Sequence, residues 1–322
     1  MKKYAFGVDI GGTTVKTGLF ETGRSRDGAD EGRLVESWEI PTDKSACGVN
    51  ILPDIAKSVK AKLKELGLKE DDIEGIGLGV PGPVDPDGNV LKCVNLGWDI
   101  FNVEDSLKEL TGFRVKAGND ANVAALGEMW QGGGKGHDNI VMVTLGTGVG
   151  AGVILDRKIL AGINGAAGEI GHMPVRDPEE ETETCGCGKR GCLEQYCSAT
   201  GVVRLAEGYL KNNPETLSKL KDAGRIDSKI VFDLAKEGDK AALEILEEFS
   251  EILGRALASV ACVVNADIFV LGGGVSKAGP ILTEKVGEKY KKYAFHACAD
   301  TPFALAVLGN DAGMYGAVYQ LY

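Results

Sequence analysis

Apolar residues in this chain form short runs that alternate with longer helical patterns, and glycine ends most of the runs. The short β-rich runs predict strands at residues 4–8, 15–20, 73–80, 113–117, 140–145, 151–155 and 268–271. Apolar positions three to four residues apart predict a helix at 51–66, and further helices are expected at 122–130, 240–264 and 312–322. Strands alternating with helices indicate sheets covered by helices, which is an α/β fold.

One local arrangement occurs twice along the chain. The strands at 4–8 and 15–20 flank a glycine–threonine turn, and the strands at 140–145 and 151–155 flank another. Two such hairpins predict two related α/β halves around a cleft, each offering a turn to phosphate. We expect a small domain at residues 1–118, joined by the C-terminal helix at about 305–322, and a larger domain at 119–304.

The glycine-rich turns carry the residues that phosphoryl transfer needs, which are backbone amides, hydroxyl donors and one carboxylate. The predicted nucleotide-binding residues are Asp9, Gly11, Gly12, Thr13, Thr14, Lys16, Thr147, Gly148, Gly272, Gly273 and Gly274. Asp9 is a candidate ligand of Mg²⁺, because hard cations prefer oxygen. Plain tight turns are the alternative for each turn alone, but three at strand ends favour a nucleotide.

Two other nucleotide motifs fail on their context. The pattern G-x-G-x-x-G occurs at 77–82 and at 186–191. The first ends among prolines where a helix should begin, and the second lies among cysteines. The segment at 132–136 has a lysine among glycines, but it ends in Gly136 where a P-loop needs serine or threonine. The sequence therefore argues against a Rossmann dehydrogenase and a P-loop NTPase.

One histidine and three cysteines lie within a short stretch: His172, Cys185, Cys187 and Cys192. These are ligands that tetrahedral Zn²⁺ prefers, and neighbouring glycines let the backbone curl around an ion. Glu169 and Glu194 flank the cluster and are not needed as ligands, which suggests a polar pocket beside the metal. The alternatives are a zinc knuckle remote from any substrate, or free thiols.

Composition limits the classes of function. The chain has 322 residues and a formal net charge of −11, which argues against nucleic acid as a partner. It shows no secretory signal and no membrane-length apolar run, so we expect a cytoplasmic protein without a membrane partner. The acidic residues 179–181 are expected to form a solvent-exposed face. The cysteines outside the cluster are expected to be buried thiols; they are Cys47, Cys93, Cys197, Cys262 and Cys298.

Six motifs together resemble the ROK sugar kinases, a branch of the actin-like ATPase superfamily that also contains sugar-responsive repressors. They are the segments 9–13, 79–85, 119–122, 145–150, 168–172 and 185–194. The resemblance covers essentially the whole chain and is strongest with ATP-dependent glucokinases. It implies an actin-like (ribonuclease H-like) α/β fold, ATP, Mg²⁺ and Zn²⁺ as cofactors, a hexose as substrate, and a homodimer or a dimer of dimers.

The resemblance also implies roles for individual residues. Asp120 would be the catalytic base, and the expected sugar contacts are Asn95, Asn119, Asp120, Glu169, His172 and Glu194. The zinc ligands would be the histidine and three cysteines already named. The metal would then shape two walls of the sugar pocket, with less effect on the nucleotide.

Chemistry alone supports a carboxylate such as Asp120 beside a sugar hydroxyl, since it can orient the hydroxyl and accept its proton. The alternative for Asp120 is the N-cap of the helix at 122–130. The preferred hexose stays open among glucose, mannose, fructose and the N-acetylated glucosamine and mannosamine. A sugar-sensing DNA-binding regulator is the rival function, which we expect less because the first turn begins at Asp9, leaving no room for a DNA-binding domain before it.

Overall fold

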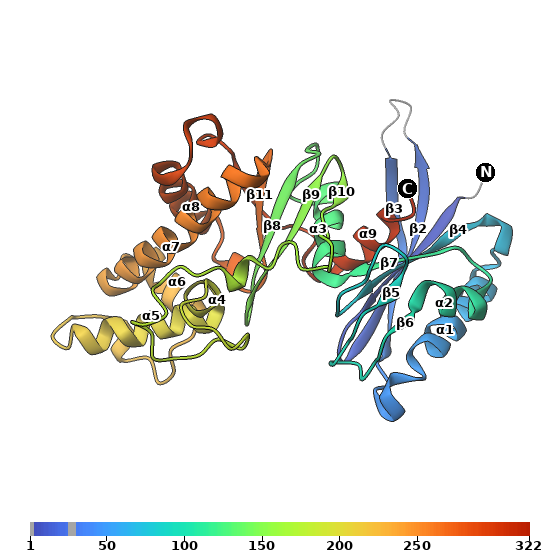
Figure 1. The fold of residues 1–322 in the computed structure, drawn as a ribbon, viewed down its shortest axis with the longest axis horizontal. Coiled ribbons are helices and arrows are strands. Elements are labelled where there is room, and N and C mark those ends of the chain that lie inside the picture. Colours follow the sequence, from blue (N-terminus) through green and yellow to red (C-terminus); the bar gives the residue numbers. More distant parts are fainter. Residues whose placement is uncertain (1–2, 25–29) are drawn as a thin grey trace. The chain divides into compact units, whose positions relative to one another are not determined.

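The computed structural model of the chain describes residues 3–24 and 30–322. Backbone contacts divide the chain into two compact units. Unit 1 comprises residues 1–136, 152–167 and 308–322, and unit 2 comprises residues 137–151 and 168–307. Figure 1 shows both units as a ribbon, with elements labelled where there is room.

Unit 1 is built on a five-stranded sheet with the order β3-β2-β1-β4-β7. Strands β1, β2 and β3 form an antiparallel meander, and β4 and β7 extend the sheet in parallel with β1. The bounds are Tyr4–Ile10 for β1, Thr14–Arg24 for β2, Asp30–Pro41 for β3, Ile73–Val80 for β4 and Val115–Asn119 for β7. A two-stranded ribbon is formed by β5 (Asn89–Val90) and β6 (Phe101–Asn102).

Helices cover both faces of this sheet (Figure 1). The apolar stripes of α1 (Ile51–Leu66) and α2 (Val103–Thr111) share one core with alternate side chains of β1 and β4. On the other face, α9 (Ala312–Tyr319) packs against Gly7 and Gly77, and a Cβ atom on either glycine would collide with its backbone carbonyls. Between α9 and α3 (Asp120–Gln131), Gly127 and Gly316 allow the same close approach. Side-chain-free positions thus fix α9 and α3 to the strands that carry the candidate site.

The second sheet has the order β10-β9-β8-β11-β12, and the division between the units passes through β9. Strand β11 runs parallel to both β8 and β12. The bounds are Ile140–Leu145 for β8, Val149–Leu155 for β9, Lys158–Ile159 for β10, Ile268–Gly272 for β11 and Phe303–Leu305 for β12. The paired parallel strands repeat the plan of the first sheet, as the repeated hairpin predicts.

The helices of unit 2 pack around the long helix α7, whose apolar face is buried along most of its length. They are α4 (Glu194–Cys197), α5 (Ala199–Asn212), α6 (Ser228–Lys236), α7 (Lys240–Val264) and α8 (Pro280–Tyr293). A cluster of Phe269, Tyr290 and Phe303 rings joins α8 to the sheet, with centroids 5.1–5.4 Å apart. Short 3₁₀ helices lie at 45–48, 70–72, 170–172, 219–221, 275–278, 296–298 and 309–311.

The two compact units do not follow the predicted boundary after residue 118. Helix α3 belongs to unit 1, because it packs against α9 along its length. The C-terminal segment, residues 308–322, also belongs to unit 1.

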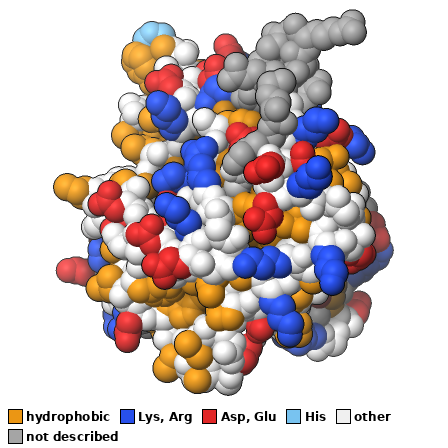
Figure 2. All heavy atoms as spheres, turned by 90° about the vertical axis from the view of Figure 1, so that its right-hand side faces the viewer, with side chains coloured by type: hydrophobic (Ala, Val, Ile, Leu, Met, Phe, Trp, Pro, Cys, Tyr) orange, Lys and Arg blue, Asp and Glu red, His pale blue; other side chains and the backbone are white. Residues whose placement is uncertain are grey.

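Over the face of unit 1 drawn in Figure 2, acidic and basic side chains are interspersed with apolar ones. Among the described residues, no helix is both long enough and apolar enough to cross a bilayer.

Candidate active site

Two carboxylates of unit 1 lie close together at the carboxyl ends of β1 and β7. A Cβ atom on Gly79 would lie 3.3 Å from Oδ1 of Asp9 and 3.8 Å from the Cα of Asp120. Burial is the main cause that raises the pKa of Asp9 from 3.8 to about 6, the charge of Asp120 is the second, and Lys16 opposes them. A buried carboxylate with a raised pKa beside a second carboxylate is typical of sites that bind a cation or move a proton.

Asn119, rather than Asp120, is the N-cap of α3. Its Oδ1 accepts hydrogen bonds from the backbone amides of Ala121 and Asn122 at 3.1 and 3.2 Å. Its Nδ2 donates to Oδ1 of Asp120 at 3.1 Å and to the carbonyl of Gly82 at 3.3 Å. Oδ1 of Asp120 also accepts the amide of Ala121, at 2.8 Å. Asn119 therefore holds the N-cap position, and its amide group together with the first turn of α3 orients the Asp120 carboxylate.

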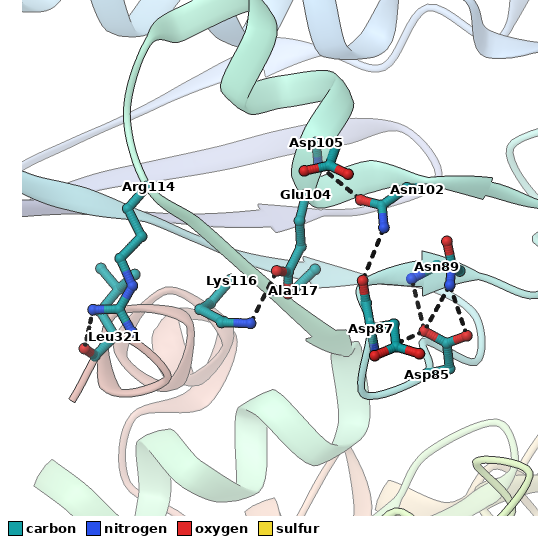
Figure 3. A network of polar contacts seen from close by, with 10 residues as sticks. All are labelled: Asp85, Asp87, Asn89, Asn102, Glu104, Asp105, Arg114, Lys116, Ala117 and Leu321. Carbon is teal, nitrogen blue, oxygen red and sulfur yellow. Dashed lines mark hydrogen bonds and ion pairs between the residues drawn. The ribbon is translucent and has the colours of Figure 1, made fainter.

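Glu104 of α2 holds the strand that ends at this site, and nothing in the sequence pattern pointed to it. Its carboxylate accepts hydrogen bonds from the backbone amide of Ala117 at 2.9 Å and from Nζ of Lys116 at 3.0 Å (Figure 3). The Glu104 side chain is only 14% exposed. This contact fixes β7 just before Asn119, and it joins positions too far apart in sequence for a motif to reveal.

The first phosphate turn joins β1 to β2. The amide of Gly11 donates to the carbonyl of Thr14 at 2.9 Å, and Gly12 and Thr13 are exposed. Thr42 braces the turn, because its hydroxyl donates to the Gly11 carbonyl at 2.7 Å and its amide to that of Thr13 at 2.9 Å. Three hydrogen bonds therefore hold the turn while Gly12 and Thr13 stay exposed, which suits a turn that binds an anion.

Lys16 and Asn95, two further predicted residues of unit 1, have different surroundings. Nζ of Lys16 lies 3.5 Å from a Glu39 oxygen and 3.9 Å from an Asp311 oxygen, so the lysine is already engaged by carboxylates. Asn95 is exposed near the tip of a short loop closed by the bridge between Cys93 and Trp98.

In unit 2 the second phosphate turn lies between β8 and β9. The amide of Gly146 donates to the carbonyl of Gly148 at 2.9 Å, and Thr147 is exposed. Glu194 reaches this turn, since its Oε2 accepts the amide of Val149 at 3.0 Å. Its other oxygen lies 3.6 Å from Sγ of Cys185. One carboxylate therefore touches both the turn and the cysteine cluster.

The predicted metal ligands come together. One ligand atom from each of His172, Cys185, Cys187 and Cys192 lies within 4.8 Å of all the others. Sγ of Cys187 lies 3.6 Å from Sγ of Cys192, and Sγ of Cys185 lies 3.7 Å from Nδ1 of His172. Tetrahedral Zn–S bonds of about 2.3 Å would place sulfurs about 3.8 Å apart, so the set fits a metal ion of that size.

The thiols of the cluster have pKa values that are shifted in opposite directions. Burial raises the pKa of Cys192 to about 12, whereas a hydrogen bond from the backbone amide of Lys189 lowers the pKa of Cys187. The loop around the cluster depends on Gly188 and Gly191, whose φ values are 84° and 75°.

His172 presents its two ring nitrogens to different partners. Nδ1 faces the cysteines, whereas Nε2 lies 3.9 Å from a carboxylate oxygen of Glu169. A metal ion bound through Nδ1 would leave the Nε2 hydrogen pointing toward Glu169. The Glu169 side chain is 62% exposed, so it remains accessible to a ligand.

Two minor expectations hold only in part, since Glu179 and Glu180 are exposed and Cys93, Cys197 and Cys298 are buried as expected. Glu181 does not lie on a solvated face, because its carboxylate accepts hydrogen bonds from Arg204 and Tyr196 and is 14% exposed. Cys47 and Cys262 are exposed rather than buried.

The third glycine turn follows β11. Gly273 has φ of 83°, and a Cβ atom there would lie 2.5 Å from the carbonyl oxygen of Leu145, so only glycine fits. Gly274 lines a cavity of about 120 Å³ together with Phe232 and Lys277. A second cavity of unit 2, of about 700 Å³, is lined by Thr147 and residues of α5 and the 223–228 loop. The two glycine turns of unit 2 thus each contribute a residue, Thr147 or Gly274, to the lining of a cavity.

Comparison with known proteins identifies the family of this chain. Residues 5–321 match the sequence model of the ROK family. The chain belongs to the ROK family. It is 42% identical to a glucokinase of Halalkalibacterium halodurans over 98% of this chain and 93% of that protein, and 36% identical to a glucokinase of Thermotoga maritima over 97% and 95%. The structure of a ROK glucokinase from Streptomyces griseus in complex with glucose and AMPPNP is 31% identical, with a TM-score of 0.69 and coverage of 98% and 97%.

Membership of the ROK family confirms the resemblance on which the sequence prediction was based, and the α/β fold class with it. The match runs through both units and includes all six motifs.

Proposed function

We propose that this ROK protein is an ATP-dependent hexokinase that transfers a phosphoryl group to the 6-hydroxyl of glucose. The observation that carries the proposal is the position of Asp120, which Asn119 orients beside Asp9 at the end of β7. The 42% identity to a glucokinase over nearly the whole chain supports the choice of sugar.

Asp120 would act as the general base. A sugar hydroxyl is a poor nucleophile, and its proton must leave as the bond to phosphorus forms. A carboxylate held by Asn119 can accept a hydrogen bond from that hydroxyl and then its proton. Asn119 would serve two roles, because its side chain caps α3 and would also bind a sugar hydroxyl. We assign the other sugar hydroxyls to Asn95 and Asn119 of unit 1 and to Glu169, His172 and Glu194 of unit 2.

The nucleotide would be held by the glycine turns. The amides and hydroxyls of residues 11–14 and 146–148 suit the phosphates, and the side-chain-free turn Gly272–Gly274 suits close backbone approach to the base and ribose. When bound, Mg²⁺ would neutralise charge that develops on the transferring phosphoryl group. Asp9 is the residue placed to hold it, directly or through water, and Lys16 would balance the local charge.

We assign the His–Cys₃ cluster to Zn²⁺ on the fit of its ligand atoms. The ion would be structural, since four protein ligands leave no open position. We also infer a homodimer or a dimer of dimers, as the family resemblance implies, and a cytoplasmic location, where ATP is available.

The test of the assignment is Asp120→Asn. We expect kcat to fall at least a hundredfold, because general-base catalysis contributes about 10²–10⁴, while glucose affinity changes little. Asp105→Asn, an exposed aspartate in the first turn of α2, is the matched control and should keep full activity. Near-normal turnover in Asp120→Asn would refute the proposed base.

The choice of sugar is tested by ADP release over a panel of hexoses. We expect the highest kcat/KM for glucose against mannose, fructose, N-acetylglucosamine and N-acetylmannosamine. A higher value for any other sugar would replace glucose as the substrate and leave the kinase assignment intact. No turnover with any sugar, together with sugar binding, would favour a regulator.

A further inference from the structure

A cavity of about 560 Å³ lies in unit 1 between the first turn of α1 and the last turns of α2. Its apolar wall is formed by Leu52, Pro53, Trp98, Phe101 and Leu110. The volume falls in the range of small-molecule sites, about 300–1,000 Å³. None of the predicted catalytic, sugar-binding, nucleotide-binding or metal-binding residues lines it.

The charged side chains that line this cavity are all acidic. Asp99 and Glu109 are both in the lining, and the described lining residues include no lysine, arginine or histidine. Neither carboxylate forms an ion pair with a described residue. The rings of Trp98 and Phe101 stand edge to face at 5.2 Å, and aromatic faces attract cations within about 6 Å. Apolar walls, aromatic rings and two carboxylates together complement an organic cation with an apolar body.

The cavity lies against a segment that reaches two parts of the candidate active site. Within residues 42–48, Thr42 braces the first phosphate turn, and the Gly48 carbonyl accepts a hydrogen bond from Nε1 of Trp98 at 3.1 Å. Trp98 closes the loop that carries Asn95. A Cβ atom on Gly97 would lie 3.1 Å from the Cα of Cys47, so the two segments are in close contact.

The middle of this segment is strained. Ala46 and Cys47 have φ values of 46° and 59°, although neither is a glycine. Consecutive left-handed residues of this kind persist only where the surroundings hold them. Both line the cavity, so an occupant would touch the strained residues directly.

We propose that this cavity is an effector site for an organic ammonium ion with an apolar or aromatic body. The body would pack on Leu52, Trp98 and Leu110, and the ammonium group would lie beside Asp99 and Glu109. Occupancy would act on the Asn95 loop through Trp98, and so would change the KM for the sugar. This last step rests on the proposed function, whereas binding itself does not.

The test uses Cys47 as a reporter, because its thiol is exposed and lines the cavity. Iodoacetamide alkylation of each cysteine is followed by peptide mass spectrometry in 4-phenylbutylammonium, 4-phenylbutanol or 4-phenylbutyrate, which share one body. We expect the ammonium probe to slow alkylation of Cys47 about fivefold or more and the other two to do so less. Cys262, exposed in unit 2, is the internal control and should react at one rate throughout.

The matched variant is Asp99→Asn combined with Glu109→Gln, two exposed positions that leave the apolar wall in place. It should remove the difference between the three probes and leave kinase activity without probe unchanged. Equal protection by all three probes, no protection by the ammonium probe, or discrimination that survives in the variant would each overturn the site. If Cys47 is protected but neither the sugar KM nor sugar affinity changes, the coupling is refuted and the binding site stands.

Discussion

Replacing Asp9 by asparagine should stabilise the protein while it destroys the proposed activity. Burial and the charge of Asp120 raise the pKa of Asp9 from 3.8 to about 6, so the folded chain disfavours the charged carboxylate. One pKa unit corresponds to about 1.4 kcal/mol. The charged carboxylate therefore costs up to about 3 kcal/mol of unfolding free energy at neutral pH, and asparagine, which is never charged, removes that cost.

The stabilisation by Asp9→Asn should depend on pH, because the pKa of Asp9 differs between the folded and the unfolded chain. Below about pH 4, Asp9 is protonated in both the folded and the unfolded chain and costs nothing. As the pH rises from about 4 to 6, only the unfolded chain releases its proton, so the free energy of unfolding falls. Above about pH 6 the loss is complete. The advantage of Asp9→Asn should therefore be near zero at pH 4 and reach its full value by pH 7.

Urea unfolding without added Mg²⁺ measures this effect, with tryptophan fluorescence as the signal. The three tryptophans of the chain, Trp38, Trp98 and Trp130, all lie in unit 1, so the signal reports the unit that contains Asp9. Asp71→Asn, at an exposed position of the same unit, is the control and should change stability little at any pH. Equal stability of Asp9→Asn and wild type at pH 7, or a gain of the same size at pH 4, would refute the reasoning.

Three further predictions concern the other parts of the site. Thr13→Ala removes an exposed hydroxyl of the first phosphate turn and should raise the KM for ATP about five- to tenfold, the value of one hydrogen bond; a rise confined to the sugar KM would contradict it. Glu104→Ala should lower kcat about tenfold by releasing β7, and Glu104→Gln, which can still accept the Ala117 amide, should restore most of it. Stripping the metal, or Cys187→Ala, should lower the melting temperature and weaken both glucose and ATP binding, measured separately by calorimetry.

Elements with strong apolar periodicity could be predicted from the sequence. The helix at 51–66 and the strand at 140–145 begin and end where the pattern places them. Strand β3 was not predicted, since its exposed edge position leaves charged and apolar residues mixed along residues 30–41. Helix α2 was not predicted either, because it is short and begins at an Asn102 cap that looks like any polar loop residue.

Some features of the candidate site could likewise be predicted from the sequence, and others could not. The grouping of His172 with Cys185, Cys187 and Cys192 could be predicted, because the four residues are close in sequence and chemically distinctive. The proximity of Asp9 to Asp120 could not, because it depends on the parallel pairing of β1, β4 and β7. The contact of Glu104 with Ala117 is of the same kind, since a helix docks on a strand through one side chain.

Glu194 changes what the metal is expected to do. The sequence suggests that the cluster shapes the sugar pocket and leaves the nucleotide largely alone. In the structure, Oε2 of Glu194 accepts the amide of Val149 in the second phosphate turn, and Oε1 lies 3.6 Å from Cys185. Glu194 also begins α4 two residues after Cys192. A cluster that loosens without its ion would therefore release a carboxylate that holds the phosphate turn, and ATP affinity should fall together with glucose affinity.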